Sequence, residues 1–224
     1  MSPPSQLLFD ALQYDIINCY FITDYKFLIL SKQTVRIYKK IYHTIYKNIL
    51  IVFASRDGHF DIVKRLHQTG ASINEYDNGC ICWSSQGGHL EIVKYLHQQG
   101  ADITNIDYNP IYSASSGGHL HVVQYLHQHG VDVKALDNTP ICWASSHGHI
   151  NVVEYLHQHG ADITARGNTP ICWAANAGHL EIVRYVHEHG ADIKAKNNYP
   201  IYAATRNNHT AVVQYLQQHG AHLP

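Results

Sequence analysis

The sequence predicts an all-α solenoid made of about six short, 30-residue repeats joined by shortened turns. Two observations lead to this class. Glycines recur at one fixed interval from Gly70 through Gly100 to Gly220, and histidines recur at the same interval from His59 to His209. Each interval has room for two short helices, which cannot bury an apolar face alone. Successive units are therefore expected to stack into one continuous core.

The first helix of a unit is expected to begin at a proline, because the missing N–H costs nothing in the first helical turn. The prolines at this place are Pro110, Pro140, Pro170 and Pro200. In three units the residue before the proline is suited to cap the helix. These expected N-caps are Asn109, Thr139 and Thr169. The helix then runs through small residues and ends at the glycine before the histidine column.

The second helix follows directly, with Leu120, Val123 and Leu126 at helical spacing in the third unit. It is expected to stop at Gly130, because glycine readily adopts the left-handed conformation that ends a helix. Columns of tryptophan and tyrosine are assigned to packing between units. The predicted units cover about 48–77, 78–107, 108–137, 138–167, 168–197 and 198–224. Residues 1–47 do not match the repeat and are predicted to form an N-terminal helical cap or a segment of another kind.

Charge and hydropathy narrow the choice of partners. The formal net charge is -1 and no basic stripe emerges, so a nucleic-acid partner is not expected. The most apolar stretch, residues 16–30, contains Asp24 and Lys26 and is too short to span a bilayer. The first ten residues lack the basic and apolar regions of a secretory signal. We therefore expect a soluble protein without a membrane partner.

The five cysteines are expected to stay reduced. Cys82, Cys142 and Cys172 share one column of the repeat, whereas Cys19 and Cys80 stand outside it. Stacked helices lie about 8 to 10 Å apart, but a disulfide needs Cα atoms within about 7 Å. Reduced cysteines are typical of intracellular proteins, so an intracellular, cytoplasmic location is expected.

The sequence offers 19 histidines, but we predict no metal site. His127 and His129, like the other pairs two residues apart, point about 200° apart on a helix, whereas two ligands of one ion need neighbouring faces. Histidines of different units are expected to lie too far apart, given the helix spacing. Cys142 lies near His147 in the sequence, but its recurring column indicates a small packed side chain. We therefore predict no catalytic residue and no cofactor.

Two of the units, NTPICWASSHGHINVVEYLHQHGADI and NTPICWAANAGHLEIVRYVHEHGADI, resemble ankyrin repeats, whose signature includes T-P-L-H-x-A and G-H. The resemblance covers about residues 49 to 224. The string VVEYLHQHGADI is similar to the repeats of ankyrin-repeat proteins encoded by giant DNA viruses. Ankyrin repeats usually have a slightly longer period, and the missing residues fall in the turn between units. Cys82, Tyr112, Cys142, Cys172 and Tyr202 replace the histidine of T-P-L-H.

The resemblance implies a non-catalytic scaffold that presents a concave surface to a protein partner, with host proteins as candidates if the source is viral. No small-molecule substrate is predicted, and a monomer is expected. The alternative is an enzyme or a substrate adaptor of a ubiquitin ligase, in which residues 1–47 carry the activity, for the adaptor through an F-box-like segment. An enzyme needs a cluster of titratable residues, whereas a scaffold does not. Because residues 1–47 offer only Asp10, Asp15, Asp24, Cys19 and His43, the scaffold interpretation is favoured.

The resemblance also implies where a partner binds, because ankyrin repeats usually meet partners through the turns between units and the ends of the first helices. At these places the chemistry changes from unit to unit, while the packing columns barely change. The predicted protein-binding residues are Tyr76, Ile106, Tyr108, Leu136, Asn138, His147, Arg166, Asn168, Asn176, Lys196 and Arg206.

Overall fold

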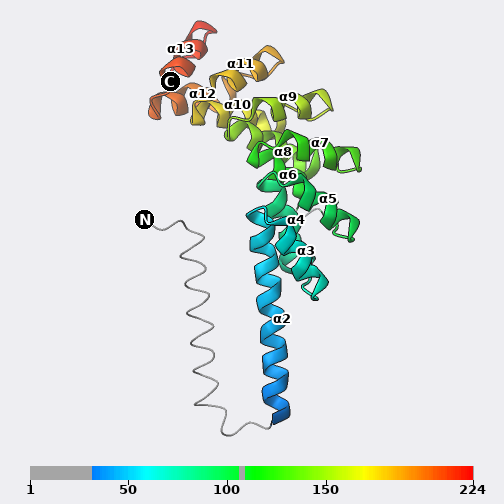
Figure 1. The fold of residues 1–224 in the computed structure, drawn as a ribbon. Coiled ribbons are helices and arrows are strands. Elements are labelled where there is room, and N and C mark those ends of the chain that lie inside the picture. Colours follow the sequence, from blue (N-terminus) through cyan, green and yellow to red (C-terminus); the bar gives the residue numbers. More distant parts are fainter. Residues whose placement is uncertain (1–31, 106–108, 224) are drawn as a thin grey trace. The chain divides into compact units, whose positions relative to one another are not determined.

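The structure, a computed structural model, describes residues 32–105 and 109–223, and the side chains from residue 44 onward except those of residues 75–77. Within these ranges every regular element is a helix (Figure 1). The chain divides into two compact units, Met1–Tyr46 and Lys47–Pro224. Most of the first unit lies outside the described residues, as does most of the predicted cap. None of the described helices is long and apolar enough to cross a membrane.

The helices alternate between two places in the repeat. The first helices of the repeats are α2 (Lys32–Arg56), α4 (Glu75–Gln86), α6 (Pro110–Gly117), α8 (Ala135–Ser146), α10 (Ala165–Ala177) and α12 (Ala195–Arg206). The second helices are α3 (Phe60–Gln68), α5 (Leu90–Gln98), α7 (Leu120–Gln128), α9 (Ile150–Gln158), α11 (Leu180–Glu188) and α13 (Thr210–Gln218). We number these pairs of helices as repeats 1 to 6. The boundary between the two compact units falls within α2, so only its residues 47–56 belong to the second unit. The predicted all-α solenoid is confirmed.

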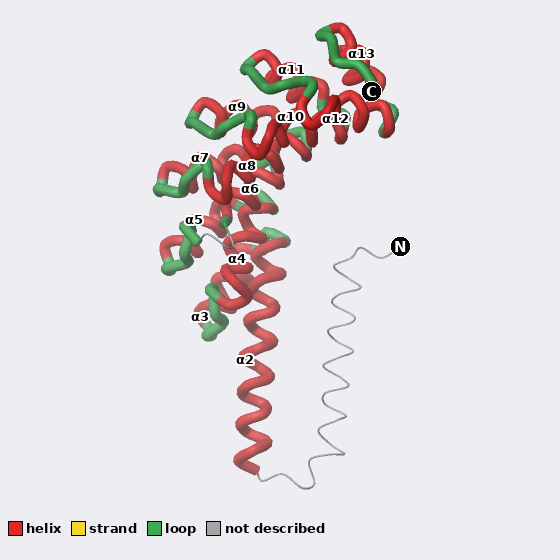
Figure 2. Tube along the Cα trace, turned by 180° about the vertical axis from the view of Figure 1, so that it is seen from behind, coloured by secondary structure: helices red, strands yellow, loops and turns green. Residues whose placement is uncertain are grey.

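Within Lys47–Pro224 the repeats form a curved stack (Figures 1 and 2). From α4 onward, each first helix packs against the next first helix and against the second helix of its own repeat. The first helices lie on the inner side of the curve, and the second helices fan outward. This arrangement leaves the inner helices and the turns before them as the concave side of the stack.

A column of isoleucines forms the centre of the core. Its members are fully buried and stand at the same place in successive repeats: Ile51, Ile81, Ile111, Ile141, Ile171 and Ile201. Burial of one such side chain contributes roughly 1.5 to 3 kcal/mol. Val123 and Leu126 are also fully buried in the third repeat, as their spacing predicts. Because the same side chains recur in every repeat, each junction is stabilised in the same way.

The histidine column ties each repeat to the one before it. Nε2 of His149 lies 3.0 Å from the carbonyl oxygen of Ser116, and the same contact recurs at 33 residues' separation for His89, His179 and His209. The glycine before the histidine of the preceding repeat makes room for the ring. A Cβ added at Gly118 would lie 2.4 Å from Nδ1 of His149. The G-H pair of one repeat therefore serves both its own turn and the contact with its neighbour.

Tyrosines and histidines of the second helices form a repeated cluster, which we call the His–Tyr–His trio. In one trio, Nδ1 of His157 lies 2.9 Å from the hydroxyl of Tyr185, and Nδ1 of His189 lies 2.7 Å from the carbonyl oxygen of Tyr185. The imidazole centroids are 5.0 Å apart. The other trios are His97/Tyr125/His129, His127/Tyr155/His159 and His187/Tyr215/His219.

The trios correct one expectation. Histidines of different repeats do approach each other, because long side chains reach across the junction from helices whose axes are farther apart. The described residues nevertheless contain no group of three or more His, Cys, Asp or Glu residues arranged to hold a metal ion.

The shortened turn between repeats has an unusual backbone. Leu136, Asp137 and Asn138 all have positive φ values, of 53°, 55° and 58°, and the same three places are left-handed near the starts of α10 and α12. A left-handed residue with a side chain costs roughly 1 to 2 kcal/mol. We call these three-residue segments, 136–138, 166–168 and 196–198, the fingers.

The three predicted N-cap residues differ in what their side chains bind. Asn109 caps its helix as predicted, since its side chain accepts a hydrogen bond from the N–H of Ile111 at 3.0 Å. The hydroxyls of Thr139 and Thr169 instead donate to carbonyl oxygens of the finger residues Leu136 and Arg166. The prediction that these threonines cap the helix was wrong, because the left-handed finger brings a carbonyl oxygen to each hydroxyl.

Candidate protein-binding surface

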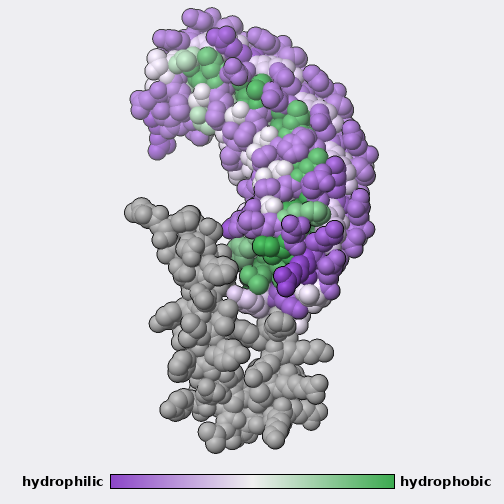
Figure 3. All heavy atoms as spheres, viewed as in Figure 1, coloured by the Kyte–Doolittle hydropathy of each residue, from purple (hydrophilic) through white to green (hydrophobic). Residues whose placement is uncertain are grey.

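The fingers and the inner helices of repeats 4 to 6 present a continuous set of exposed or half-buried polar and aromatic side chains. We call this set the inner surface; it comprises Leu136, Asp137, Trp143, His147, Arg166, Trp173, Asn176, Lys196, Tyr199, Tyr202 and Arg206. In the view of Figure 3, hydrophobic residues of the described stack form a row of separate groups among hydrophilic ones. The residues of the inner surface themselves combine charged, amide and aromatic side chains, so a partner would meet mixed chemistry there.

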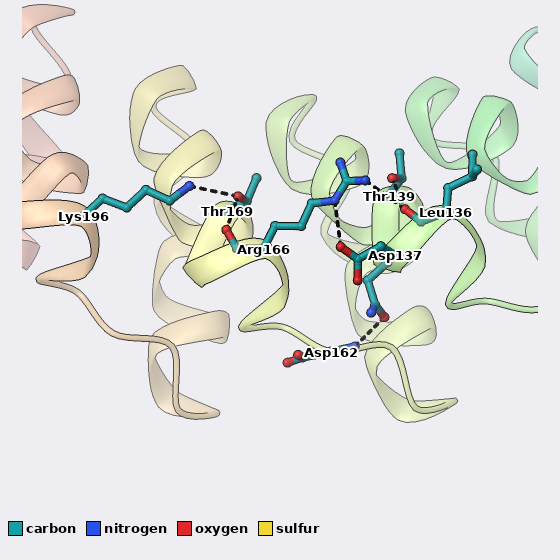
Figure 4. A network of polar contacts seen from close by, with 8 residues as sticks. Leu136, Asp137, Thr139, Asp162, Arg166, Thr169 and Lys196 are labelled. Carbon is teal, nitrogen blue, oxygen red and sulfur yellow. Dashed lines mark hydrogen bonds and ion pairs between the residues drawn. The ribbon is translucent and has the colours of Figure 1, made fainter.

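Two cations of the fingers reach back along the stack by one repeat each (Figure 4). Nε of Arg166 lies 3.3 Å from Asp137, and its Nη2 donates to the carbonyl oxygen of Leu136 at 3.1 Å. Nζ of Lys196 donates to the hydroxyl of Thr169 at 3.2 Å. Such exposed contacts contribute little to stability. They do place the charged groups in a row across three repeats.

Aromatic rings on α8 and α10 contact one another across the repeats. Trp143 is stacked on His147 with 5.3 Å between the ring centroids, and its edge contacts Trp173 at 5.4 Å. Tyr112 contacts Trp143 from the preceding repeat at 5.7 Å. These contacts between repeats confirm the packing role predicted for Trp143 and Trp173. The rings of Trp143 and Trp173 remain half-buried, so they also present surface to a partner.

Exposed aromatic residues also occur on α12. Tyr199 and Tyr202 are 38% and 47% exposed. With Arg206 they stand at helical positions i, i+3 and i+7, which places all three on one face. Arg206 is exposed, and its guanidinium has no hydrogen bond or ion pair to another described residue. Two tyrosines and an unpaired cation thus share one exposed face.

The inner surface of repeats 5 and 6 is positively charged. Residues 165–178 and 195–208 contain Arg166, Lys196 and Arg206 and no Asp or Glu. In repeat 5, Glu181 and Glu188 lie instead on the second helix, and Asp192 is exposed in the turn before α12. Asp137 of repeat 4 is paired with Arg166. Although the chain as a whole is nearly neutral, this part of the inner surface carries three cations.

The structure places the predicted binding residues in three groups. His147, Arg166, Asn176, Lys196 and Arg206 are exposed on the inner surface, and Leu136 is half-buried there. Ile106 and Tyr108 lie outside the described residues, and the side chain of Tyr76 is not described.

Asn138 and Asn168 form the third group and hold the stack together. Their side-chain oxygens accept hydrogen bonds from the N–H groups of Asp162 and Asp192 in the next repeat, at 2.9 and 2.8 Å. Asn48 binds Ser72 in the same way. A role in partner binding for Asn138 and Asn168 stays a prediction.

Sequence reasoning missed the exposed aromatic residues. Trp83, 44% exposed, was assigned to packing with the rest of its column. A signal existed for two others. Tyr199 stands where the two preceding repeats have Thr139 and Thr169, and Tyr202 stands where they have cysteine. A change from a small to a large aromatic residue within a repeated column indicates a place where packing no longer limits size.

The described cysteines are mostly buried. Cys80, Cys142 and Cys172 are buried and Cys82 is partly so; none of these four, which are the described cysteines, forms a disulfide. Burial raises the pKa of the Cys142 thiol to about 11 and that of Cys82 to about 12. A thiol with so high a pKa is a poor nucleophile at neutral pH. The imidazole of His147 is held by the carbonyl oxygen of Trp143 at 3.0 Å.

The geometry defines a helical-repeat protein with a concave inner side. The family model "Ankyrin repeats (3 copies)" matches residues 24–107, 104–166 and 164–224, so the chain belongs to the ankyrin-repeat family. Among solved structures, the human ASB11 ankyrin repeat domain is similar, with a TM-score of 0.66 and 24% sequence identity. The alignment covers 77% of this chain and 84% of that one. A comparison with curated proteins finds no match. Ankyrin repeats generally mediate protein–protein interaction and typically do not catalyse reactions.

Proposed function

We propose that this chain is a non-catalytic scaffold that holds a protein partner on the inner surface of repeats 4 to 6. The observation that carries the proposal is the combination on this surface of half-buried tryptophans, exposed tyrosines and exposed cations. Aromatic and arginine side chains are the commonest strong anchors of protein interfaces. Because the curved stack fixes these groups on neighbouring helices, little ordering is needed when a partner binds.

The chemistry of the surface favours an extended acidic segment as the partner. Arg166, Lys196 and Arg206 form the charged part. Asp137 is paired with Arg166, and the inner segments 165–178 and 195–208 themselves hold no carboxylate. Charge complementarity steers association and suppresses wrong partners. Apolar or aromatic residues in the same segment would contact Trp173 and Tyr202. We therefore assign the surface to a segment in which acidic and apolar residues alternate.

A nucleic acid fits the same surface less well. Its affinity depends on neutralising many phosphates, and the inner segments of repeats 5 and 6 hold only three cations, of which Arg166 is already paired with Asp137. The aromatic groups would also stack with bases, so single-stranded DNA belongs in the test as a competing ligand.

The test measures binding of short labelled peptides to the full chain by fluorescence anisotropy. The acidic probe is a twelve-residue peptide of the repeated sequence Gly-Glu-Phe-Glu; its counterparts carry glutamine or lysine in place of glutamate, and a twelve-nucleotide oligothymidine completes the set. We expect the acidic peptide to bind most tightly, with an affinity that falls as salt is added.

Charge-reversal variants locate the site. Lys196→Glu with Arg206→Glu should weaken binding of the acidic peptide about tenfold or more, equivalent to about 1.4 kcal/mol. Lys194→Glu is the matched control, because Lys194 is exposed in the same repeat but lies beside Gly220 at the end of the second helix. Equal loss in both proteins, tighter binding of the oligothymidine, or no preference for the acidic peptide would contradict the proposal.

The location, source and oligomeric state belong to the same proposal. We place the chain inside a cell, as a monomer. The absence of a disulfide among the four described cysteines supports an intracellular site. The resemblance to viral ankyrin proteins makes host-cell proteins the first partners to examine. Analytical ultracentrifugation of the purified chain tests the monomer, and a dimer at micromolar concentration would contradict it.

The alternative role, a ubiquitin-ligase adaptor with an F-box-like N-terminus, stays a prediction. Residues 1–31, which hold most of the proposed segment, lie outside the described residues. Capture experiments with the full chain and with a chain beginning at residue 32 separate the two roles. Recovery of ubiquitin-ligase components only with the full chain would favour the adaptor.

A further inference from the structure

We propose that the His–Tyr–His trios make the stack sensitive to acid, so that protonation loosens the junctions between repeats 2 and 6. Each trio brings two imidazoles of adjacent repeats together around one tyrosine, with ring centroids 4.9 to 5.2 Å apart. Four junctions carry this arrangement. Because each repeat contacts mainly its neighbours, weakening these junctions lowers the stability of the whole stack.

Hydrogen bonding fixes one proton of each trio. In the trio of His157, Tyr185 and His189, the carbonyl oxygen of Tyr185 can only accept, so Nδ1 of His189 carries a hydrogen and donates it. The hydroxyl of Tyr185 can donate to Nδ1 of His157 while that nitrogen is unprotonated. The neutral trio therefore satisfies both contacts without placing a charge between the repeats.

Acid places positive charges on the trio. When His157 and His189 are both protonated, two cations face each other 5.0 Å apart between their ring centroids. The hydroxyl of Tyr185 can then accept from Nδ1 of His157, so the hydrogen bond need not be lost. The penalty comes from repulsion between the rings and from the partial burial of one of them. This penalty acts across the junction and pushes the repeats apart.

Other charged groups near the trios are few. Asp162 faces His157 and favours its protonated form, and Glu154 lies near Tyr185. At the next junction Glu188 favours protonated His187, while the guanidinium of Arg184 lies over the ring of Tyr215, 5.4 Å from its centroid. At the junction of His97, Lys94 is near the hydroxyl of Tyr125.

These groups do not reverse the effect. Burial lowers the pKa of His97, His157 and His187, and the partner imidazole lowers each further. A free histidine titrates near pH 6.5. Below that pH the unfolded chain binds protons that these native side chains still exclude, so stability falls as pH falls. The loss begins near pH 6.5 and continues down to the lowered native pKa values.

The junction between repeats 1 and 2 provides a natural comparison. His67 approaches the hydroxyl of Tyr95 at 2.8 Å, as in the trios, but Gln99 stands where the other repeats have the second histidine. No second imidazole can become charged there. Glutamine is therefore compatible with this place in the fold, and a histidine-to-glutamine change removes the charge while keeping a native residue type.

The acid response regulates the inner surface described above, and this part rests on the proposed function. Arg166 of repeat 5 is bound to Asp137 of repeat 4, and Lys196 of repeat 6 is bound to Thr169 of repeat 5. These contacts cross the junctions that carry trios. Loosening those junctions moves Arg166, Lys196 and Arg206 out of the arrangement that the partner binds. Acid should therefore release the partner. Stability of the free chain is measured without any partner and tests the acid response by itself.

The experiment compares urea unfolding midpoints at pH 7.5 and pH 5.5 for the full chain and two variants. In the first, His189→Gln and His219→Gln remove the second histidine from the trios of His157 and His187, where the pKa of the first histidine is lowered. The acid-induced fall in midpoint should become smaller, because burial still lowers the pKa of His157 and His187 but a second cation no longer faces either ring. In the second, His59→Gln and His222→Gln change two exposed histidines outside the trios, and the fall should remain.

Equal acid responses in the two variants, or a wild-type midpoint unchanged by acid, would overturn the proposal. If the first variant folds poorly, NMR titration of the wild-type histidines decides. We expect the imidazoles of His97, His157 and His187 to show pKa values below that of a model peptide, because burial and the neighbouring imidazole both disfavour the charged form. Transitions of all three at the pH of a model peptide would overturn it.

Discussion

Nδ1 of His157 lies 2.9 Å from the hydroxyl oxygen of Tyr185, 28 residues later and one repeat farther along the stack. The same contact recurs for His67, His97, His127 and His187. It joins the end of the second helix of one repeat to the middle of the second helix of the next repeat. Every described junction between second helices therefore has a polar tie beside its apolar core.

Tyr185→Phe should lower the free energy of unfolding by about 1 kcal/mol, the usual net contribution of one hydrogen bond. The ring and its packing are kept, so the change reports the hydroxyl alone. Tyr202→Phe is the matched control, because its ring is 47% exposed and no described residue is hydrogen-bonded to its hydroxyl. Urea unfolding followed by circular dichroism measures both. Equal effects would show that the Tyr185 hydroxyl adds nothing to the junction.

Gly118→Ala should destabilise the chain more than Gly100→Ala does. Both glycines have positive φ, of 77° and 90°, so each alanine carries left-handed strain of roughly 1 to 2 kcal/mol. Only at Gly118 does the new Cβ meet a ring, 2.4 Å from Nδ1 of His149; nothing lies within 4 Å at Gly100. The clash should add about 1 to 3 kcal/mol, the typical cost of overpacking.

A double-mutant cycle tests the cause of that difference. Adding His149→Ala to Gly118→Ala should cost less than the sum of the two single changes, because the smaller side chain relieves the clash. Additive effects in thermal or urea unfolding would exclude contact between this glycine and this ring as the source of the destabilisation.

The Cys142 thiol should react slowly in the native chain, because it is fully buried and its pKa is raised to about 11. Since the thiolate is the reactive form, alkylation of Cys142 at pH 8 should speed up greatly when the chain is unfolded in urea. Mass spectrometry of proteolytic peptides follows this cysteine separately from Cys19. Rapid native alkylation would contradict both the burial and the raised pKa.

Deletion of one full period should leave a folded, shorter stack. Removing residues 111–140 joins Pro110 to Ile141 and keeps every column in register. Contacts in such a stack join neighbours, so the new junction repeats a native one. Removing residues 111–125 breaks the register and should abolish cooperative unfolding. Similar circular dichroism and unfolding curves for the two deletions would show that the period is wrong.

Acid should destabilise the histidine column as well as the trios. Burial lowers the pKa of His119 and His149, although each ring is bonded to a backbone carbonyl group that partly opposes the shift. Both rings are neutral in the native and unfolded chains above about pH 6.5. Below it the unfolded chain gains protons first, so the free energy of unfolding decreases with falling pH. His149→Gln should reduce this slope, whereas a slope equal to that of the wild type would show that His149 does not contribute.

The candidate site was only partly predictable. The variable places at the fingers and helix ends identified Arg166, Lys196 and Arg206, which the structure leaves exposed. The same reasoning also selected Asn138 and Asn168, because a sequence does not show that their amides bind the next repeat. It overlooked Tyr199 and Tyr202, since exposure of an aromatic side chain depends on neighbours that only the fold brings close.

The sequence by itself determined the class of fold, because a strict short period with apolar residues at helical spacing admits only stacked pairs of short helices. It also determined the isoleucine core and the glycines that end the second helices, which are local or strictly periodic features. The tertiary structure alone decided what the histidines do. Their partners lie 28 or 33 residues away on another repeat, and no local pattern encodes such a contact. It also decided the left-handed fingers, because residues such as Leu136 adopt that backbone only when the packed helices on either side require it.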